Sequence, residues 1–173
     1  MITQPARSGS AVLIGRKVRL REIDPADRRT LVGFDRDSTP QLGGYRHWAA
    51  HRASAADADD DSQFAIETLR GGVLVGSMCV TADPETHRLS YGIGIAPQHQ
   101  RCGYAADAIT ALLAYAFGER GYRKCEVSIY GGNLASLALH GSLGFREESR
   151  PRDTELLRGH VKYPVMMGMT AEE

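Results

Sequence analysis

The chain has 173 residues, 42% of them hydrophobic, which suits a single folded domain with its own core. Its 21 basic side chains balance 21 acidic ones, and this balance argues against a general surface for DNA, RNA or membranes. The balance does not exclude a specific anion-binding site made of backbone amides, because these amides do not enter the charge count.

Cysteine usage and the N-terminal segment indicate the compartment. Cys79, Cys102 and Cys125 form no CxxC pair, so they predict neither a metal cluster nor a disulfide framework. Residues 1–10 lack the apolar core of a signal peptide, and no apolar run approaches the length of about 18 residues that a transmembrane helix needs. We therefore expect a soluble, cytoplasmic protein without a metal.

Alternating apolar residues and turn residues predict most of the strands. We expect a flexible tail at 1–10 and one domain at 11–170, with a hairpin turn at Gly71–Gly72 and another turn at 83–86. The run at 73–82 is almost wholly apolar, as in a strand covered on both faces. The predicted strands lie, in chain order, at residues 18–23, 64–69, 73–82, 88–95, 125–130, 145–150 and 162–169.

Helices are predicted at three places. Asp24 is a candidate N-cap and Pro25 fits the first helical position after it. A short helix is expected at 136–143. The longest helix should begin near Tyr104 and stop near Gly121, because an apolar stripe at helical spacing lies between them: Ala105, Ala108, Ile109, Leu112, Leu113 and Ala116. The expected fold class is mixed α/β, an antiparallel meander followed by helix, strand, helix and closing strands.

The segment that joins the strand at 88–95 to this long helix predicts an anion site. The first turn of a helix has backbone N–H groups without helical partners and a partial positive charge. Gly103 leaves room for close approach, and Gln100 and Arg101 can add donors. The loop suits a pyrophosphate, although an ordinary glycine turn is the alternative. It matches neither a Walker loop nor a dinucleotide fingerprint.

Two motifs resemble those of a known family. "QRCGYA" at 100–105 resembles the Q/R-x-x-G-x-G/A acetyl-CoA motif of the GCN5-related N-acetyltransferases. "NLASLALHGSLGF" at 133–145 is similar to the family's N-x-x-S…Y-x-x-L-G-F segment. "GRKVRLREIDPAD" at 15–27 looks like its first strand and helix, most of all in the subgroup acting on ribosomal-protein N-termini and antibiotics. The resemblance covers most of residues 10–169.

The resemblance implies a mostly antiparallel, twisted sheet flanked by helices, whose fourth and fifth strands splay apart to admit acetyl-CoA. The pantetheine arm would pair with the open edge of the strand at 88–95, where Gly92 and Gly94 signal a bulge or a closely approaching ligand. Asn133 and Ser136 would bind the pantetheine arm or simply cap a helix. The implied cosubstrate-binding residues are Ile93, Gly94, Ile95, Gln100, Arg101, Cys102, Gly103, Tyr104, Ala105, Asn133 and Ser136.

The implied chemistry is attack of an amine on the thioester. An alkylammonium with a pKa of about 10.4 must first lose a proton, and Glu67 is the first candidate for the base, ahead of Glu22 and His47. The alternative for Glu67 is a solvated strand face. The family commonly places Tyr where this chain has His140, which could protonate the departing thiolate or only bond to backbone.

Five aromatic or His side chains are candidates for the acceptor site. Tyr45, His47 and Trp48 follow the first helix, whereas Tyr91 and Tyr130 lie on the two strands that would splay. Packing against the sheet is their alternative role. The expected activity is N-acetyl transfer to a primary amine. The alternatives are a non-catalytic acyl-CoA-binding module or use of another acyl-CoA, such as succinyl-CoA. The apolar run at 163–169 could join a homodimer interface.

Overall fold

The structure is a computed structural model that describes residues 12–37, 61–130, 133–149, 155–157, 160–162 and 164–172. The expected tail at 1–10 lies outside the described residues, as do three acceptor candidates, Tyr45, His47 and Trp48.

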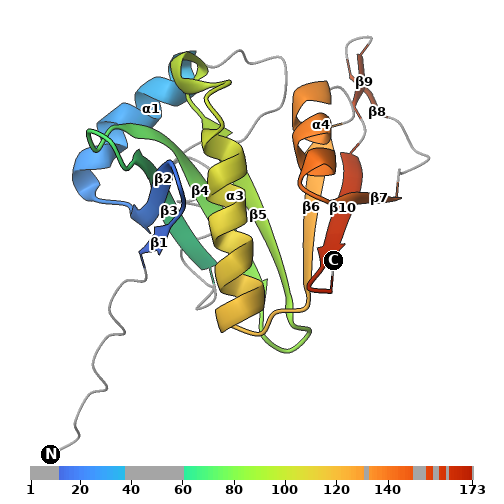
Figure 1. The fold of residues 1–173 in the computed structure, drawn as a ribbon. Coiled ribbons are helices and arrows are strands. Elements are labelled where there is room, and N and C mark those ends of the chain that lie inside the picture. Colours follow the sequence, from blue (N-terminus) through green and yellow to red (C-terminus); the bar gives the residue numbers. More distant parts are fainter. Residues whose placement is uncertain are drawn as a thin grey trace, which may run out of the picture.

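An eight-stranded sheet forms the centre of the fold, with strand order β1-β2-β3-β4-β5-β6-β10-β7 (Figure 1). All neighbouring strands are antiparallel except β5 and β6, which confirms the mixed and mostly antiparallel class. A small hairpin is formed by β8 (Glu155–Leu157) and β9 (His160–Lys162). The strands of the main sheet are β1 (Leu13–Ile14), β2 (Val18–Glu22), β3 (Asp61–Thr68), β4 (Leu74–Asp83), β5 (Arg88–Ile95), β6 (Lys124–Tyr130), β7 (Arg146–Ser149) and β10 (Pro164–Thr170).

The helices begin close to the predicted positions. Asp24 accepts a hydrogen bond from the N–H of Ala26 (2.8 Å), and Asp27 accepts one from the N–H of Asp24 (2.8 Å). This capping box starts a 3₁₀ turn, which leads directly into the first α-helix. The helical elements are η1 (Pro25–Asp27), α1 (Arg28–Asp37), η3 (Pro97–His99), α3 (Tyr104–Leu113), the wider π-helical turn η4 (Ala114–Glu119) and α4 (Leu134–Ser142).

The main core lies between one face of the sheet and two helices. Leu20 pairs with Ile66 and Met78 pairs with Ile93, so side chains from β2 to β5 share this face. Figure 1 shows α3 in front of β4 and β5, and α4 in front of β6 and β10. Helix α1 packs through a separate cluster of Leu31, Phe34, Ala96, Ile23 and Leu74.

The apolar C-terminal strand belongs to this core. β10 pairs with β6 on one edge and with β7 on the other, and Val165, Met167 and Met169 are buried. Its hydrophobic character is therefore explained within the chain and gives no argument for an interface. None of the helices among the described residues is long and apolar enough to cross a membrane.

Candidate active site

Strands β5 and β6 separate almost as soon as they meet. They pair only at Arg88 with Lys124 and at Leu89 with Cys125. Beyond these pairs β5 continues to Ile95 and β6 continues to Tyr130. Figure 1 shows the two strands diverging between α3 and α4. The splay that the sequence resemblance implies is therefore present.

The backbone of β5 offers hydrogen-bonding groups to this opening. On the β4 side, the N–H of Ala96 donates to the carbonyl of Val75 (2.8 Å), whereas on the β6 side the carbonyl of His87 accepts from the N–H of Arg123 (2.8 Å). Backbone direction alternates along a strand, and β5 pairs with β4 without a register shift. The groups that face the opening therefore belong to the odd-numbered residues Tyr91, Ile93 and Ile95.

This regular register bears on the two expectations for Gly92 and Gly94, namely a bulge or a closely approaching ligand. No bulge interrupts β5, so the glycines do not mark one. At the end of the strand, the side-chain amide of Gln100 donates to the carbonyl of Ile95 (3.1 Å). One backbone acceptor at the opening is thus already bonded to the loop that follows, which joins the strand edge and the loop into one site.

The loop between η3 and α3 presents a run of backbone N–H groups. Within the described part of the chain, no acceptor takes a hydrogen bond from the N–H groups of residues 101–106. The N-cap, Gly103, has no side chain to cap the helix. Arg101 and Gly103 both have positive φ, 62° and 80°. For Arg101 this conformation costs about 1 kcal/mol, and such alternating turns form anion-binding concavities.

A carboxylate fixes the turn between β1 and β2 against the first turn of α3. Asp107 accepts hydrogen bonds from three consecutive N–H groups, at 2.9, 2.7 and 2.9 Å. Burial opposes its ionisation, but these donors outweigh burial and hold the pKa of the carboxyl below its usual value. Gly15 is needed here, because a Cβ would collide with this carboxylate. The three donors belong to Arg16, Lys17 and Val18.

The same turn brings an ammonium group to the loop. Nζ of Lys17 donates to the carbonyl of Cys102 (2.8 Å) and lies 2.8 Å from the position that a Cβ on Gly103 would occupy. Sequence reasoning missed Lys17 and Asp107. Their contacts join positions about 90 residues apart, and no local pattern signals such a pair.

His140 is buried and engaged at both ring nitrogens. Nδ1 lies 2.8 Å from the carbonyl of Ser136, which can only accept, so Nδ1 carries the proton. Nε2 then accepts from the hydroxyl of Tyr91 (2.9 Å). The His140 residue is 3% exposed, and its ring packs edge-on against Phe145. Burial lowers the pKa of His140, and therefore its neutral form is favoured.

The start of α4 is capped by another of the predicted residues. The side-chain oxygen of Asn133 accepts from the N–H of Ser136 (3.2 Å). Ser136 thus lies between the cap and His140, since its carbonyl holds Nδ1 of that ring. The helix that carries His140 is fixed from its first turn onward.

Comparisons with known proteins agree with this geometry. The family model described as "Acetyltransferase (GNAT) domain" matches residues 17–146. The chain belongs to the GNAT acetyltransferase family. An uncharacterized prophage-derived N-acetyltransferase of Bacillus subtilis, YokL, is 29% identical to it over 92% of this chain and 93% of its own length.

Two solved structures from Vibrio cholerae share the fold of this acetyltransferase. One is described as a putative ribosomal-protein-serine acetyltransferase and has a TM-score of 0.70 with 20% identity, covering 92% of this chain and 97% of its own. The other is a dodecameric spermidine N-acetyltransferase with a TM-score of 0.71 and 19% identity, covering 90% and 94%. The mixed sheet with its splay is the fold of this family.

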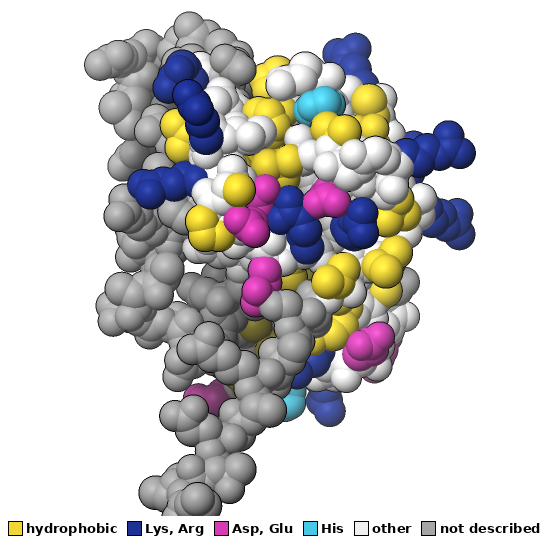
Figure 2. Space-filling view, turned by 90° about the vertical axis from the view of Figure 1, so that its left-hand side faces the viewer, with side chains coloured by type: hydrophobic (Ala, Val, Ile, Leu, Met, Phe, Trp, Pro, Cys, Tyr) yellow, Lys and Arg dark blue, Asp and Glu magenta, His cyan; other side chains and the backbone are white. Residues whose placement is uncertain are grey.

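Glu67, the first candidate for the base, is held by two arginines in this acetyltransferase. Its carboxylate forms ion pairs with Arg21 and with Arg19 (3.1 Å), and Arg21 also binds Asp27 (2.7 Å). Hydrogen bonding to Asp27, which outweighs burial, raises the pKa of Arg21. Figure 2 shows acidic and basic side chains lying side by side near the centre of the face that forms the left-hand side of Figure 1. Glu67 lies on β3, two strands away from β5 and so roughly 10 Å from it.

The remaining acceptor candidates are placed only in part. Tyr91 lies at the start of the splay, where its hydroxyl is bonded to His140. The backbone of Tyr130 ends β6, on the other side of the opening, but its side chain is not among those described. Of the five candidates, Tyr91 is therefore the one whose side chain the structure brings to the site.

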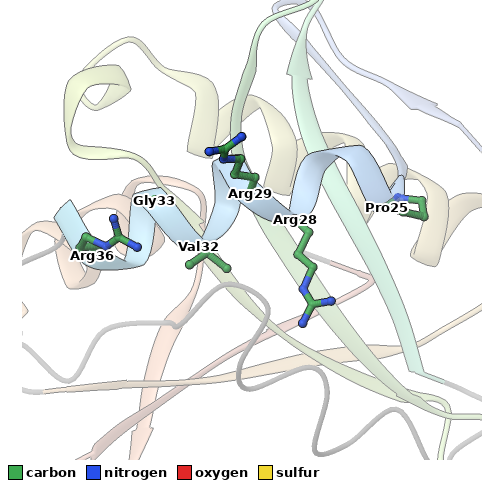
Figure 3. A pocket seen from close by; sticks show the side chains of 6 residues that line it. All are labelled: Pro25, Arg28, Arg29, Val32, Gly33 and Arg36. Atoms are coloured by element: carbon green, nitrogen blue, oxygen red, sulfur yellow. The ribbon is translucent and has the colours of Figure 1, made fainter.

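A pocket of about 560 Å³ lies on α1, apart from the residues of the loop and the splay. Figure 3 shows that Arg28 and Arg29 point to opposite sides of the helix. Because these guanidinium groups do not converge, we do not place the cosubstrate there. The lining residues are Pro25, Arg28, Arg29, Val32, Gly33 and Arg36.

Proposed function

We propose that this acetyltransferase transfers the acetyl group of acetyl-CoA to a primary amine, by direct attack of the amine in a ternary complex. The observation that carries the proposal is the run of N–H groups at residues 101–106, beside the open edge of β5. A pyrophosphate accepts hydrogen bonds and carries negative charge, so it matches both the amides and the partial positive charge of the α3 N-terminus.

The strand edge would hold the arm of the cosubstrate. Backbone groups of Ile93 and the N–H of Ile95 face the opening and can pair with pantetheine amides as a further strand would. Asn133 and Ser136, at the start of α4, would contact the arm from the other side. The amide nearest the thioester, that of Ile93, could donate to the oxygen that becomes negative as the amine attacks.

We propose that His140 acts as a neutral positioning residue for Tyr91. Its Nε2 accepts the proton of the Tyr91 hydroxyl, so it has no N–H to offer a departing thiolate. An acid role would require the imidazolium, which burial disfavours. The departing thiolate would then take its proton from water. For Glu67, the two arginine contacts support a structural role, and the base stays unassigned.

A binding module without turnover is the second candidate, because the residue at the family's usual Tyr position has no proton directed to the opening. Thiol release from acetyl-CoA and from succinyl-CoA, with a panel of amines, separates the candidates. We expect release with acetyl-CoA and at least one amine. Tight CoA binding without release across the panel would favour the module.

The acceptor panel follows from the solved structures. One is described as a putative ribosomal-protein-serine acetyltransferase and another as a spermidine N-acetyltransferase, so peptides with a free N-terminal Ser and polyamines are the first to test. One of these structures is described as dodecameric, which supports self-association, and for this chain we propose a homodimer. Native mass spectrometry of the purified protein measures the subunit count and retained CoA together.

A further inference from the structure

We propose that Lys17 is a phosphate-binding residue of the cosubstrate site, and that its partner is the diphosphate of CoA. This inference rests on the proposed function. It adds a side chain from the turn between β1 and β2, far away in the sequence, to a site otherwise made of backbone amides.

The position of the ammonium supports this role. Nζ of Lys17 donates to the carbonyl of Cys102 and lies over Gly103, inside the loop whose N–H groups have no described acceptor. An ammonium has three N–H donors, and one of them is used by the Cys102 carbonyl. The other two can reach oxygens of an anion bound by the neighbouring amides.

The turn that carries Lys17 is held against the first turn of α3 by hydrogen bonds. Asp107 accepts from the N–H of Lys17 itself (2.7 Å) and from the residues on both sides of it. Because Asp107 lies in the first turn of α3, the backbone of Lys17 is fixed to the same helix end that presents the loop amides. The long side chain therefore starts from a defined point.

Lys17 also provides charge that the amides cannot. Asp107 places a carboxylate in the first turn of α3, which opposes binding of an anion there. Its oxygens are directed to the turn amides, and the ammonium of Lys17 offsets its charge beside the loop. A neutral substitute for Lys17 would leave this carboxylate uncompensated beside a diphosphate.

The test measures the Kd of CoA and of 3′-dephospho-CoA by calorimetry at several KCl concentrations, for wild type, Lys17→Met, Lys17→Arg and Arg120→Met. Arg120 is the matched control, because its exposed cation lies at the opposite end of the α3–η4 segment. Thermal melting of each variant verifies the fold.

We expect Lys17→Met to weaken both ligands about tenfold and to reduce the salt dependence of Kd, because one charge contact is lost. Lys17→Arg should stay within about threefold of wild type and Arg120→Met should bind normally. An unchanged Kd in Lys17→Met, or a loss confined to CoA with its 3′-phosphate, overturns the assignment to the diphosphate. A wild type that does not bind CoA overturns the proposed function itself, and this inference with it.

Discussion

The hydroxyl of Tyr91 donates a hydrogen bond to Nε2 of His140 at 2.9 Å, across the point where β5 and β6 separate. The two rings also stack, with centroids 5.9 Å apart and an interplanar angle of 22°. The contact joins a strand of the sheet to helix α4 at the inner end of the proposed cosubstrate site. Because the Nδ1 proton is directed to the carbonyl of Ser136, Nε2 is the nitrogen that accepts the proton of Tyr91.

The first prediction concerns the pH dependence of turnover. If His140 works in its neutral form, kcat should not fall between pH 6.5 and 8.5, since burial lowers the pKa of His140 and its neutral form therefore predominates over this range. The measurement is the pH profile of kcat for wild type and His140→Phe. A descending limb in the wild type that disappears in the variant would show that His140 acts as an acid.

The same residue predicts how stability depends on pH. Burial keeps the pKa of folded His140 below its ordinary value of about 6.5, so the unfolded chain binds a proton at higher pH than the folded chain does. The free energy of unfolding should therefore rise with pH up to about 6.5 and fall as the pH drops below it. Urea unfolding between pH 5 and 7.5 measures this slope, and His140→Phe should be flatter. Equal slopes would contradict the prediction.

The third prediction compares two glycines with similar backbone. Gly103 has φ of 80° and Gly121 has φ of 70°, so Ala at either position should cost about 1 kcal/mol of stability. At Gly103 the new Cβ would also meet the ammonium of Lys17, whereas at Gly121 it would lie within 4 Å of no atom of the described residues. CoA affinity, measured by calorimetry, should fall in Gly103→Ala and stay unchanged in Gly121→Ala. If Gly103→Ala bound CoA as tightly as Gly121→Ala, the loop would not be part of the CoA site.

The fourth prediction tests the role of Glu67. Glu67→Gln should lower the free energy of unfolding by about 1 kcal/mol, because two guanidinium groups lose their carboxylate partner. Turnover at saturating amine should stay within about threefold of wild type, as a base would contribute at least a hundredfold. Denaturation and steady-state kinetics on one protein preparation decide whether Glu67 has a structural role or acts as the base. A hundredfold loss of kcat in a stable protein would restore Glu67 as the base.

Local patterns predict the elements around the site well. The strand at 88–95 is found with the predicted bounds, because turns flank it and apolar residues alternate along it. α3 begins at Tyr104 as predicted, since Gly103 ends the loop and an apolar stripe follows. The N-cap of the first helical segment is Asp24, as predicted, although the first turn of that segment is a 3₁₀ turn.

Long-range contacts account for what the sequence does not predict. From the sequence, Asp107 is an ordinary acidic residue in the first turn of a helix. Its hydrogen bonds to the N–H groups of residues 16–18 depend on the folded structure, which places that turn beside it. The partner of Nε2 of His140 is the hydroxyl of Tyr91, which is 49 positions away in the sequence. Glu67 alternates like any strand residue, and only the pairing of β2 with β3 places Arg19 opposite it.

The central claim is that backbone amides at the start of α3 bind the diphosphate of the cosubstrate beside the open edge of β5. A titration of ¹⁵N-labelled protein with CoA, followed by amide chemical shifts, tests it most directly. The account predicts that the largest shift changes fall on the amides of residues 101–106, together with that of Ile93. Saturating CoA binding whose largest changes lie elsewhere, for example around the arginines of α1, would contradict it.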